Sequence, residues 1–308
     1  MEPSQERKTH TKENRLIQRL KQLLLNTWLR SAGIALALFI LLKVFFFDLF
    51  TVNSRDMEGS YLKGDVLLIK KNPSNLKRGQ VILLEYPLPD SGQTAPLFIQ
   101  RLVGLAGDTL WLSDKTLFVN GELQKSHDHQ KHNYFIKTRT AQLDSAFLNH
   151  YGLNDGGPVS TGFDYSFALT ENQKLELEKD SLILSIKIKS ENKNMFDATC
   201  FPGSTHCNWN ADHYGKIYVP KKNDSLHLDT TIISLYEDII KRFEKNSLVI
   251  TQDSIFINGQ YSRSYVVKQD YYFTLGDNRD NAVDSRHWGF LPESCIRGKV
   301  LYRLKRAK

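Results

Sequence analysis

The feature that most constrains this chain is an apolar stretch near its beginning. Residues 31–52 read SAGIALALFILLKVFFFDLFTV, interrupted by charge only at Lys43 and Asp48. A bilayer core of ~30 Å needs about 20 helical residues. The stretch is therefore long enough to span once if Lys43 extends its amine toward one membrane surface. We predict a single transmembrane anchor over residues 31–50.

The residues before this anchor predict its orientation. Residues 1–30 carry seven Lys or Arg against three Glu, and we interpret them as a basic cytoplasmic or interfacial segment, with the amphipathic stretch 20–29 suited to the interface. A cleaved signal peptide is the alternative, but bulky aromatic residues at 45–47 close the apolar stretch where small residues would be expected. Most of the net charge of +7 lies in this segment, which argues against a folded nucleic-acid-binding face.

The remainder of the sequence has the pattern of β-structure. Short Val-, Ile- and Phe-rich runs at 66–69, 81–84 and 97–99 predict strands. Asn-Gly dipeptides at 120–121 and 258–259 each follow such a run, and this dipeptide favours a type I′ hairpin turn. Helical spacing of apolar residues appears once, near 231–245. We predict a mainly β outer domain on a single N-terminal transmembrane helix.

Residues 124–254 are the least regular part and predict a β-rich or irregular inserted region containing that one helix. Cys200 and Cys207 enclose a Pro-Gly turn, so in an oxidising compartment they could close a disulfide, with free thiols as the alternative. The histidines at 127–132 do not have the spacing of zinc ligands. We interpret them as part of a solvated loop and expect neither a metal nor a cofactor.

Three stretches resemble one known family. They are FFFDLFTVNSRDMEGSYLKGD at 45–65, RGQVILLEYP at 78–87 with FIQRLVGLAGDTL at 98–110, and YYFTLGDNRDNAVDSRHWGFLPES at 271–294. In this order they resemble bacterial signal peptidase I, serine peptidase family S26. The resemblance implies that 51–123 and 255–308 form the family's β core, on a membrane anchor. The intervening region resembles the long form found in Bacteroides-type bacteria.

The same resemblance implies that the catalytic residues have been replaced. The family cleaves signal peptides with a serine nucleophile and a neutral lysine base. Here Asp56 stands at the nucleophile position, Gln100 at the base position and Ala282 at the position of a base-orienting serine; Ser54 matches the oxyanion serine. An amide nitrogen such as that of Gln100 cannot take up a proton. We expect Gln100 to hydrogen-bond to Asp56 instead.

Positions around the lost dyad do match the family. The resemblance implies a structural role near the site for Met57, Arg101, Asp277, Asn278, Arg279, Asp280, Asp284 and Arg286. We expect Met57 at the mouth of the cleft and a salt bridge between Asp284 and Arg286.

Two functions follow from this pattern. The first is an inactive homologue in the bacterial inner membrane, with its N-terminus cytoplasmic and its main domain periplasmic. Its expected partners are membrane lipid, signal peptides or preproteins, and an active signal peptidase or the secretion machinery. The second is an active signal peptidase with a displaced nucleophile. Ser54 could take this role, because in a strand its side chain would lie on the same face as Asp56 and reach the cleft.

Overall fold

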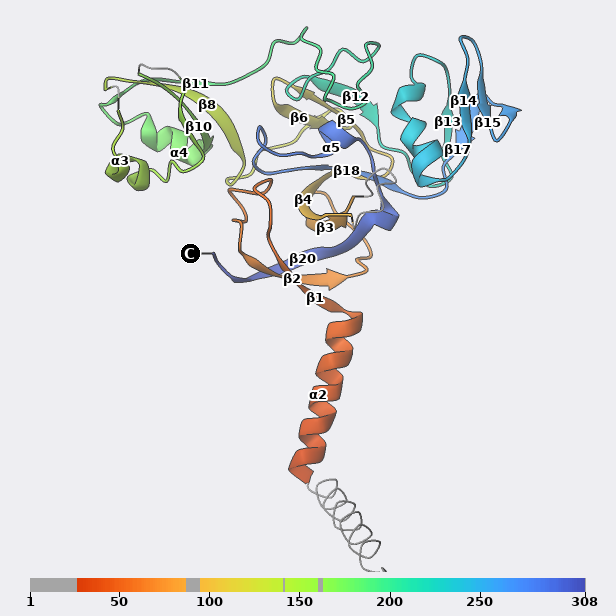
Figure 1. Cartoon of the computed structure of the whole chain (residues 1–308), viewed down its shortest axis with the longest axis horizontal. Coiled ribbons are helices and arrows are strands. Elements are labelled where there is room, and N and C mark those ends of the chain that lie inside the picture. Colours follow the sequence, from red (N-terminus) through yellow and green to blue (C-terminus); the bar gives the residue numbers. More distant parts are fainter. Residues whose placement is uncertain (1–26, 87–94, 141, 160–162, 308) are drawn as a thin grey trace, which may run out of the picture. The chain divides into compact units, whose positions relative to one another are not determined.

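The computed structural model describes residues 27–86, 95–140, 142–159 and 163–307, and the chain divides into two compact units, 1–48 and 49–308. Figure 1 shows both units with their helices and strands. The predicted interfacial segment lies almost entirely outside the described residues.

The first unit contains helix α2, Thr27–Phe45, which is long and apolar enough to cross a membrane. Its 19 residues correspond to roughly 28 Å at the usual helical rise. The helix ends before the predicted boundary because strand β1, Phe47–Thr51, starts within the predicted span. The aromatic residues and the threonine in FDLFT favour a strand over a further helical turn.

The largest sheet belongs mainly to the second unit and has the strand order β1-β2-β20-β3-β4-β18-β19. Its members after β1 are β2 (Val66–Lys71), β3 (Val81–Glu85), β4 (Leu97–Gly104), β18 (Tyr271–Leu275), β19 (Leu291–Pro292) and β20 (Ile296–Lys305). The strands predicted at 66–69, 81–84 and 97–99 are confirmed. The C-terminal strand β20 lies between β2 and β3, so distant parts of the sequence complete one sheet (Figure 1).

Both predicted hairpins are present. β5 (Thr109–Ser113), β6 (Thr116–Val119), β7 (Glu122–Leu123) and β12 (Tyr214–Tyr218) form a four-stranded sheet, and β14 (Leu248–Ile250), β15 (Ile255–Ile257) and β16 (Gln260–Tyr261) a three-stranded one. Asn120 and Gly121 have φ values of 53° and 89°, and Asn258 and Gly259 have 51° and 78°. Positive φ at both central residues is the geometry a type I′ turn requires.

The inserted region contains a sheet with its own apolar core. Its strands are β8 (Lys131–Thr138), β9 (Gly156–Pro158), β10 (Asp164–Thr170) and β11 (Ile183–Ile188), in the order β11-β8-β10-β9. Two short helices, α3 (Ser145–His150) and α4 (Glu171–Leu177), were not predicted. Each helix begins at a residue whose side chain caps it. Asp144 accepts a hydrogen bond from the N–H of Phe147, and Thr170 and Gln173 form a capping box.

The helix predicted near 231–245 is irregular. It consists of a 3₁₀ turn, η1 (Ile233–Leu235), and a π-helical turn, η2 (Ile239–Phe243), and a small sheet of β13 (Ser225–His227) and β17 (Ser264–Val266) lies in the same part of the fold. Glu244 is buried after η2, where its carboxylate accepts hydrogen bonds from the hydroxyls of Tyr265 and Tyr271. The wider π turn brings this carboxylate to both tyrosines, so tertiary contacts override the regular helical pattern.

The predicted disulfide is not formed. Cys200 and Cys207 are buried free thiols in the largest apolar cluster. Cys200 Sγ lies 3.6 Å from Asp197 Oδ2, so its thiol is turned to a carboxylate. Burial, together with that nearby negative charge, raises the pKa of Cys200 to about 12, which disfavours the reactive thiolate.

Candidate functional site

Asp56, which the resemblance places at the nucleophile position, lies in a series of turns that follows β1. Asp56 is buried, and its Oδ2 accepts a hydrogen bond from Ser54 Oγ at 3.0 Å. Burial raises the pKa of Asp56 because a carboxylate loses hydration there. Ser54 and Asp56 therefore contact each other, but the expectation that they share a strand face is wrong, because residues 54–59 form bends and turns and not a strand.

The base position, Gln100 on β4, is fully buried. Its Nε2 donates to the carbonyl oxygen of Val283 at 2.7 Å, and its Oε1 accepts from Thr274 Oγ1 at 2.7 Å. The N–H of Val283 in turn lies 3.5 Å from Asp56 Oδ1. The predicted hydrogen bond between Gln100 and Asp56 is therefore wrong, because the peptide groups of Val283 supply a partner to each of them.

The third replaced position is packed tightly. Ala282 is buried, and its methyl group supplies no hydrogen bond to the base position. A Cβ built on Gly276 would lie 2.3 Å from Ala282 Cβ and 2.5 Å from the carbonyl oxygen of Asp56. The chain can pass this close to Asp56 because residue 276 lacks a side chain.

Met57 does not lie at a cleft mouth. It is fully buried in an apolar cluster whose other members include Val52, Leu67 and Ile99. The turns after β1 direct it inward, since the N–H groups of Ser60 and Tyr61 both donate to the Met57 carbonyl oxygen. Met57 is a core residue of the β domain.

Asp277 is the centre of a charge cluster. Arg101 Nε donates to its Oδ1 at 2.8 Å and Nη2 to its Oδ2 at 2.6 Å, while Ser60 Oγ donates at 2.5 Å. His127 Nε2 lies 2.9 Å from Asp277 Oδ1 and His132 belongs to β8, so the interpretation as a solvated loop is wrong for these two histidines, whereas His129 is exposed. Burial alone would raise the pKa of Asp277, but hydrogen bonds from Arg101 and His127 hold it well below its usual range.

Asp284 and Arg286 form the predicted salt bridge. Arg286 Nε donates to Asp284 Oδ1 at 2.9 Å and Nη2 to Oδ2 at 2.8 Å, with both side chains buried. Asp284 is also the N-cap of helix α5, Ser285–Trp288. Arg286 further donates to the carbonyl oxygens of Arg279 and Ala211, which satisfies a guanidinium that burial would otherwise make costly.

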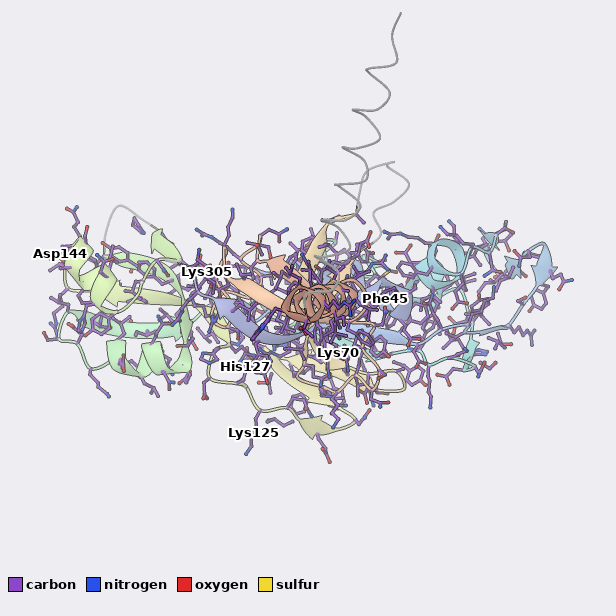
Figure 2. All side chains as sticks on the ribbon, turned by 90° about the horizontal axis from the view of Figure 1, so that it is seen from below. Phe45, Lys70, Lys125, His127, Asp144 and Lys305 are labelled. Atoms are coloured by element: carbon purple, nitrogen blue, oxygen red, sulfur yellow. The ribbon has the colours of Figure 1, made fainter. Side chains whose placement is uncertain are left out.

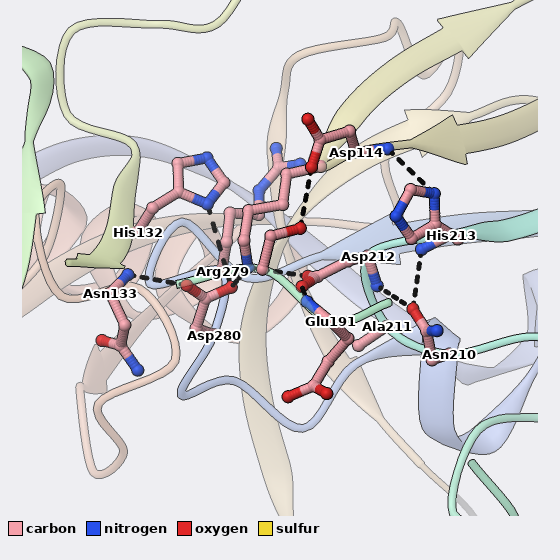
Figure 3. A network of polar contacts seen from close by, with 12 residues as sticks. Asp114, His132, Asn133, Glu191, Asn210, Ala211, Asp212, His213, Arg279 and Asp280 are labelled. Atoms are coloured by element: carbon pink, nitrogen blue, oxygen red, sulfur yellow. Dashed lines mark hydrogen bonds and ion pairs between the residues drawn. The ribbon is translucent and has the colours of Figure 1, made fainter. Parts of the chain in front are cut away.

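The inserted region and the β core share a second charge network (Figure 3). Lys115 Nζ lies 2.7 Å from both Asp212 Oδ1 and Asp280 Oδ1, and the N–H of Asn133 donates to Asp280 Oδ2 at 2.6 Å. Sequence reasoning did not find Lys115 or Asp212, which are 97 positions apart and share no motif. Asn278 links the two regions as well, donating from its N–H to the Asp56 carbonyl and from Nδ2 to Asp155.

The three positions that the resemblance implies to be replaced are held by hydrogen bonds and close packing. Asp56, Gln100 and Ala282 lie near one another around residues 274–283. Their polar atoms are engaged with backbone groups and with the hydroxyls of Ser54 and Thr274. The sequence did not indicate Thr274, which contributes a hydroxyl from a buried strand, or Val283, which contributes only its peptide groups.

Comparison with family models identifies one family. The family model described as "Signal peptidase, peptidase S26" matches residues 25–174 and 215–304, more than half of the chain. The chain belongs to the peptidase S26 family of signal peptidases.

Individual relatives are distant in sequence. The chain is 23% identical to signal peptidase I of Buchnera aphidicola subsp. Baizongia pistaciae, over 94% of this chain and 79% of that protein. It is 23% identical to signal peptidase I of Aquifex aeolicus, over 82% and 73%. A crystal structure of a signal peptidase I from Enterococcus faecalis aligns with 74% of this chain and 98% of its own, at 16% identity and a TM-score of 0.28, too low to inform the site.

Proposed function

We propose that this protein is a catalytically inactive signal peptidase I homologue that binds signal peptides or preproteins without cleaving them. The observation that carries the proposal is Gln100, which is fully buried at the base position with both amide atoms hydrogen-bonded. An amide nitrogen has no available lone pair for a proton. The residue at this position therefore cannot activate a nucleophile.

Asp56 and Ala282 support the same proposal. A carboxylate at the nucleophile position repels the negative charge that develops on a peptide carbonyl, which an active site must stabilise. Loss of one member of a serine hydrolase's catalytic set costs several orders of magnitude in rate. Here the resemblance places replacements at all three positions that make or orient the dyad.

The proposal includes a place in the cell. We infer that α2 is a single-pass anchor in the bacterial inner membrane, with the basic N-terminal residues in the cytoplasm and residues 49–308 in the periplasm. A bound signal peptide would pair as an added strand. Its partners would be an active signal peptidase or the secretion machinery. Residues 124–254 would be the insertion that characterises the long Bacteroides-type form.

The test is a cleavage assay that uses the full chain in detergent with a secretory preprotein. The natural chain should give no product, and a variant carrying Asp56→Ser, Gln100→Lys and Ala282→Ser should give cleaved protein. The variant with Asp56→Ser alone is the matched control, and it should stay inactive because it lacks a base. Cleavage by the natural chain would contradict the proposal, as would failure of that chain to bind a fluorescent signal peptide.

A specific contact favours a second candidate, an active peptidase with a displaced nucleophile. Ser54 Oγ donates to Asp56 Oδ2 at 3.0 Å, and burial raises the pKa of Asp56, which makes the carboxylate a better proton acceptor. In this case the natural chain cleaves the preprotein, and both Ser54→Ala and Asp56→Asn abolish cleavage. Activity that survives both substitutions would exclude the pair.

A further inference from the structure

A cavity of about 390 Å³ lies where the inserted region meets the β core, away from the replaced dyad. Its wall is contributed by β4 and the turn before β3, by the β5–β6 turn and β6, by the segment between β7 and β8, by residues of β8, α4 and β11, and by Arg279. Lys125 and His127, from the β7–β8 segment, lie on the same side of the second unit (Figure 2). The size of the cavity suits a small molecule.

Arg279 is the unusual member of this wall. Its side chain is 5% exposed, and its Nε–H is buried without a hydrogen-bond partner. Within the described part of the chain no carboxylate forms an ion pair with it, whereas the nearby Arg101 and Arg286 are each paired with an aspartate. A buried, unpaired guanidinium is costly. Burial and the neighbouring Arg286 lower the pKa of Arg279 to about 10, so it still carries its charge at neutral pH.

The rest of the wall is basic. Five cationic side chains line the cavity against the carboxylates of Asp114 and Glu171: Arg78, Arg101, Lys115, Lys125 and Arg279. The first three are neutralised by aspartates, namely Asp108, Asp277, and Asp212 with Asp280. Lys125 and Arg279 remain for a ligand of negative charge.

His127 indicates which kind of anion the cavity would bind. Its Nε2 faces the acceptor-only carboxylate of Asp277 and must therefore donate, while its Nδ1 is buried without a hydrogen-bond partner. In a neutral ring that nitrogen accepts a hydrogen bond. With the His127 ring neutral, the wall presents a charged donor at Arg279 and an acceptor at His127. Hydrogen phosphate has oxygens for the first and an O–H for the second, whereas a carboxylate or sulfate has no O–H.

We propose that this cavity binds the phosphate group of a small molecule, which the unpaired Arg279 recognises with assistance from His127 and Lys125. The site does not depend on the proposed loss of peptidase activity, because none of the three replaced positions contributes to its wall.

The experiment is calorimetric titration of the full chain in detergent with inorganic phosphate, glycerol 3-phosphate and sulfate. We expect phosphate binding with a dissociation constant below about 10 mM, and sulfate binding at least about tenfold more weakly, since one hydrogen bond to the ligand is missing. Tighter binding of glycerol 3-phosphate than of inorganic phosphate would identify an organic phosphate monoester as the ligand. The reverse order would identify free phosphate.

Arg279→Met tests the recognising residue. We expect phosphate binding to weaken at least about tenfold, while the melting temperature in phosphate-free buffer does not fall, because an unpaired buried charge is removed. Arg263→Gln, which changes an exposed arginine that hydrogen-bonds to Tyr261, is the control and should bind phosphate normally. Absence of phosphate binding by the natural chain would overturn the proposal, and so would equal binding of sulfate. Both results come from the natural chain and do not require the variant to fold.

Discussion

The segment from Gly276 to Arg286 has two sides that differ in how buried charge is compensated. On one side, no cationic side chain among the described residues forms an ion pair with the buried Asp56, and Gln100 and Ala282 carry no charge. On the other side, three aspartates each form an ion pair with a cationic side chain: Asp277, Asp280 and Asp284. The first side is held by hydrogen bonds and the second by ion pairs. The two kinds of contact should therefore differ in what they contribute to stability.

The largest effect is expected where an ion pair is fully buried. Arg286→Met leaves Asp284 with an uncompensated charge and removes donors to two carbonyl oxygens. We expect the free energy of unfolding to fall by about 3–5 kcal/mol. Thermal unfolding of the full chain in detergent measures it. An effect as small as that of a surface substitution would remove the distinction between the two sides.

The next prediction tests the close approach of Gly276 to the carbonyl oxygen of Asp56. Gly276→Ala would place a methyl carbon 2.5 Å from the carbonyl oxygen of Asp56, which forces a backbone shift. Overpacking of this kind costs about 1–3 kcal/mol. The matched control is Gly157→Ala, where a Cβ would meet no atom within 4 Å and where, as at Gly276, φ is outside the left-handed region. If both variants unfold alike, the close approach to Asp56 does not set the cost.

A smaller effect should depend on pH. Because burial raises the pKa of Asp56 in the folded state, folding favours its protonated form, and this contribution is lost as pH rises through the folded-state pKa. Asp56→Asn should therefore raise the melting temperature at pH 7, and the gain should shrink as pH falls toward about 4, the ordinary aspartate value. Asp253→Asn, at an exposed position, is the control. A gain that is constant with pH would contradict a buried, desolvated carboxylate.

The smallest effect belongs to an exposed ion pair. Arg297 Nε lies 2.5 Å from Glu85 Oε2, with the arginine side chain 51% exposed. Arg297→Gln should change the free energy of unfolding by less than about 1 kcal/mol, and added salt should reduce even that. A loss comparable to that of Arg286→Met would show that short distance, and not burial, decides the value of these pairs.

Local signals in the sequence were sufficient for several elements. The Asn-Gly hairpins depend on two residues that tolerate positive φ, and the strands at 66–69, 81–84 and 97–99 depend on apolar β-prone runs. Each was found because its cause lies within a few neighbouring residues. The irregular segment at 233–243 was misjudged as a regular helix because its geometry follows from Glu244 contacting Tyr265 and Tyr271, which come later in the chain.

The sequence by itself determined that Asp56, Gln100 and Ala282 stand where the resemblance implies the dyad and its orienting serine, and that an amide such as that of Gln100 cannot act as a base. It also indicated the apolar N-terminal helix and the salt bridge between Asp284 and Arg286. Tertiary structure alone decided that Val283 separates Asp56 from Gln100, that Met57 is a core residue, and that Lys115 joins Asp212 to Asp280. These contacts join residues that are distant in the chain, and partners of this kind are selected by packing and by the need to compensate buried charge.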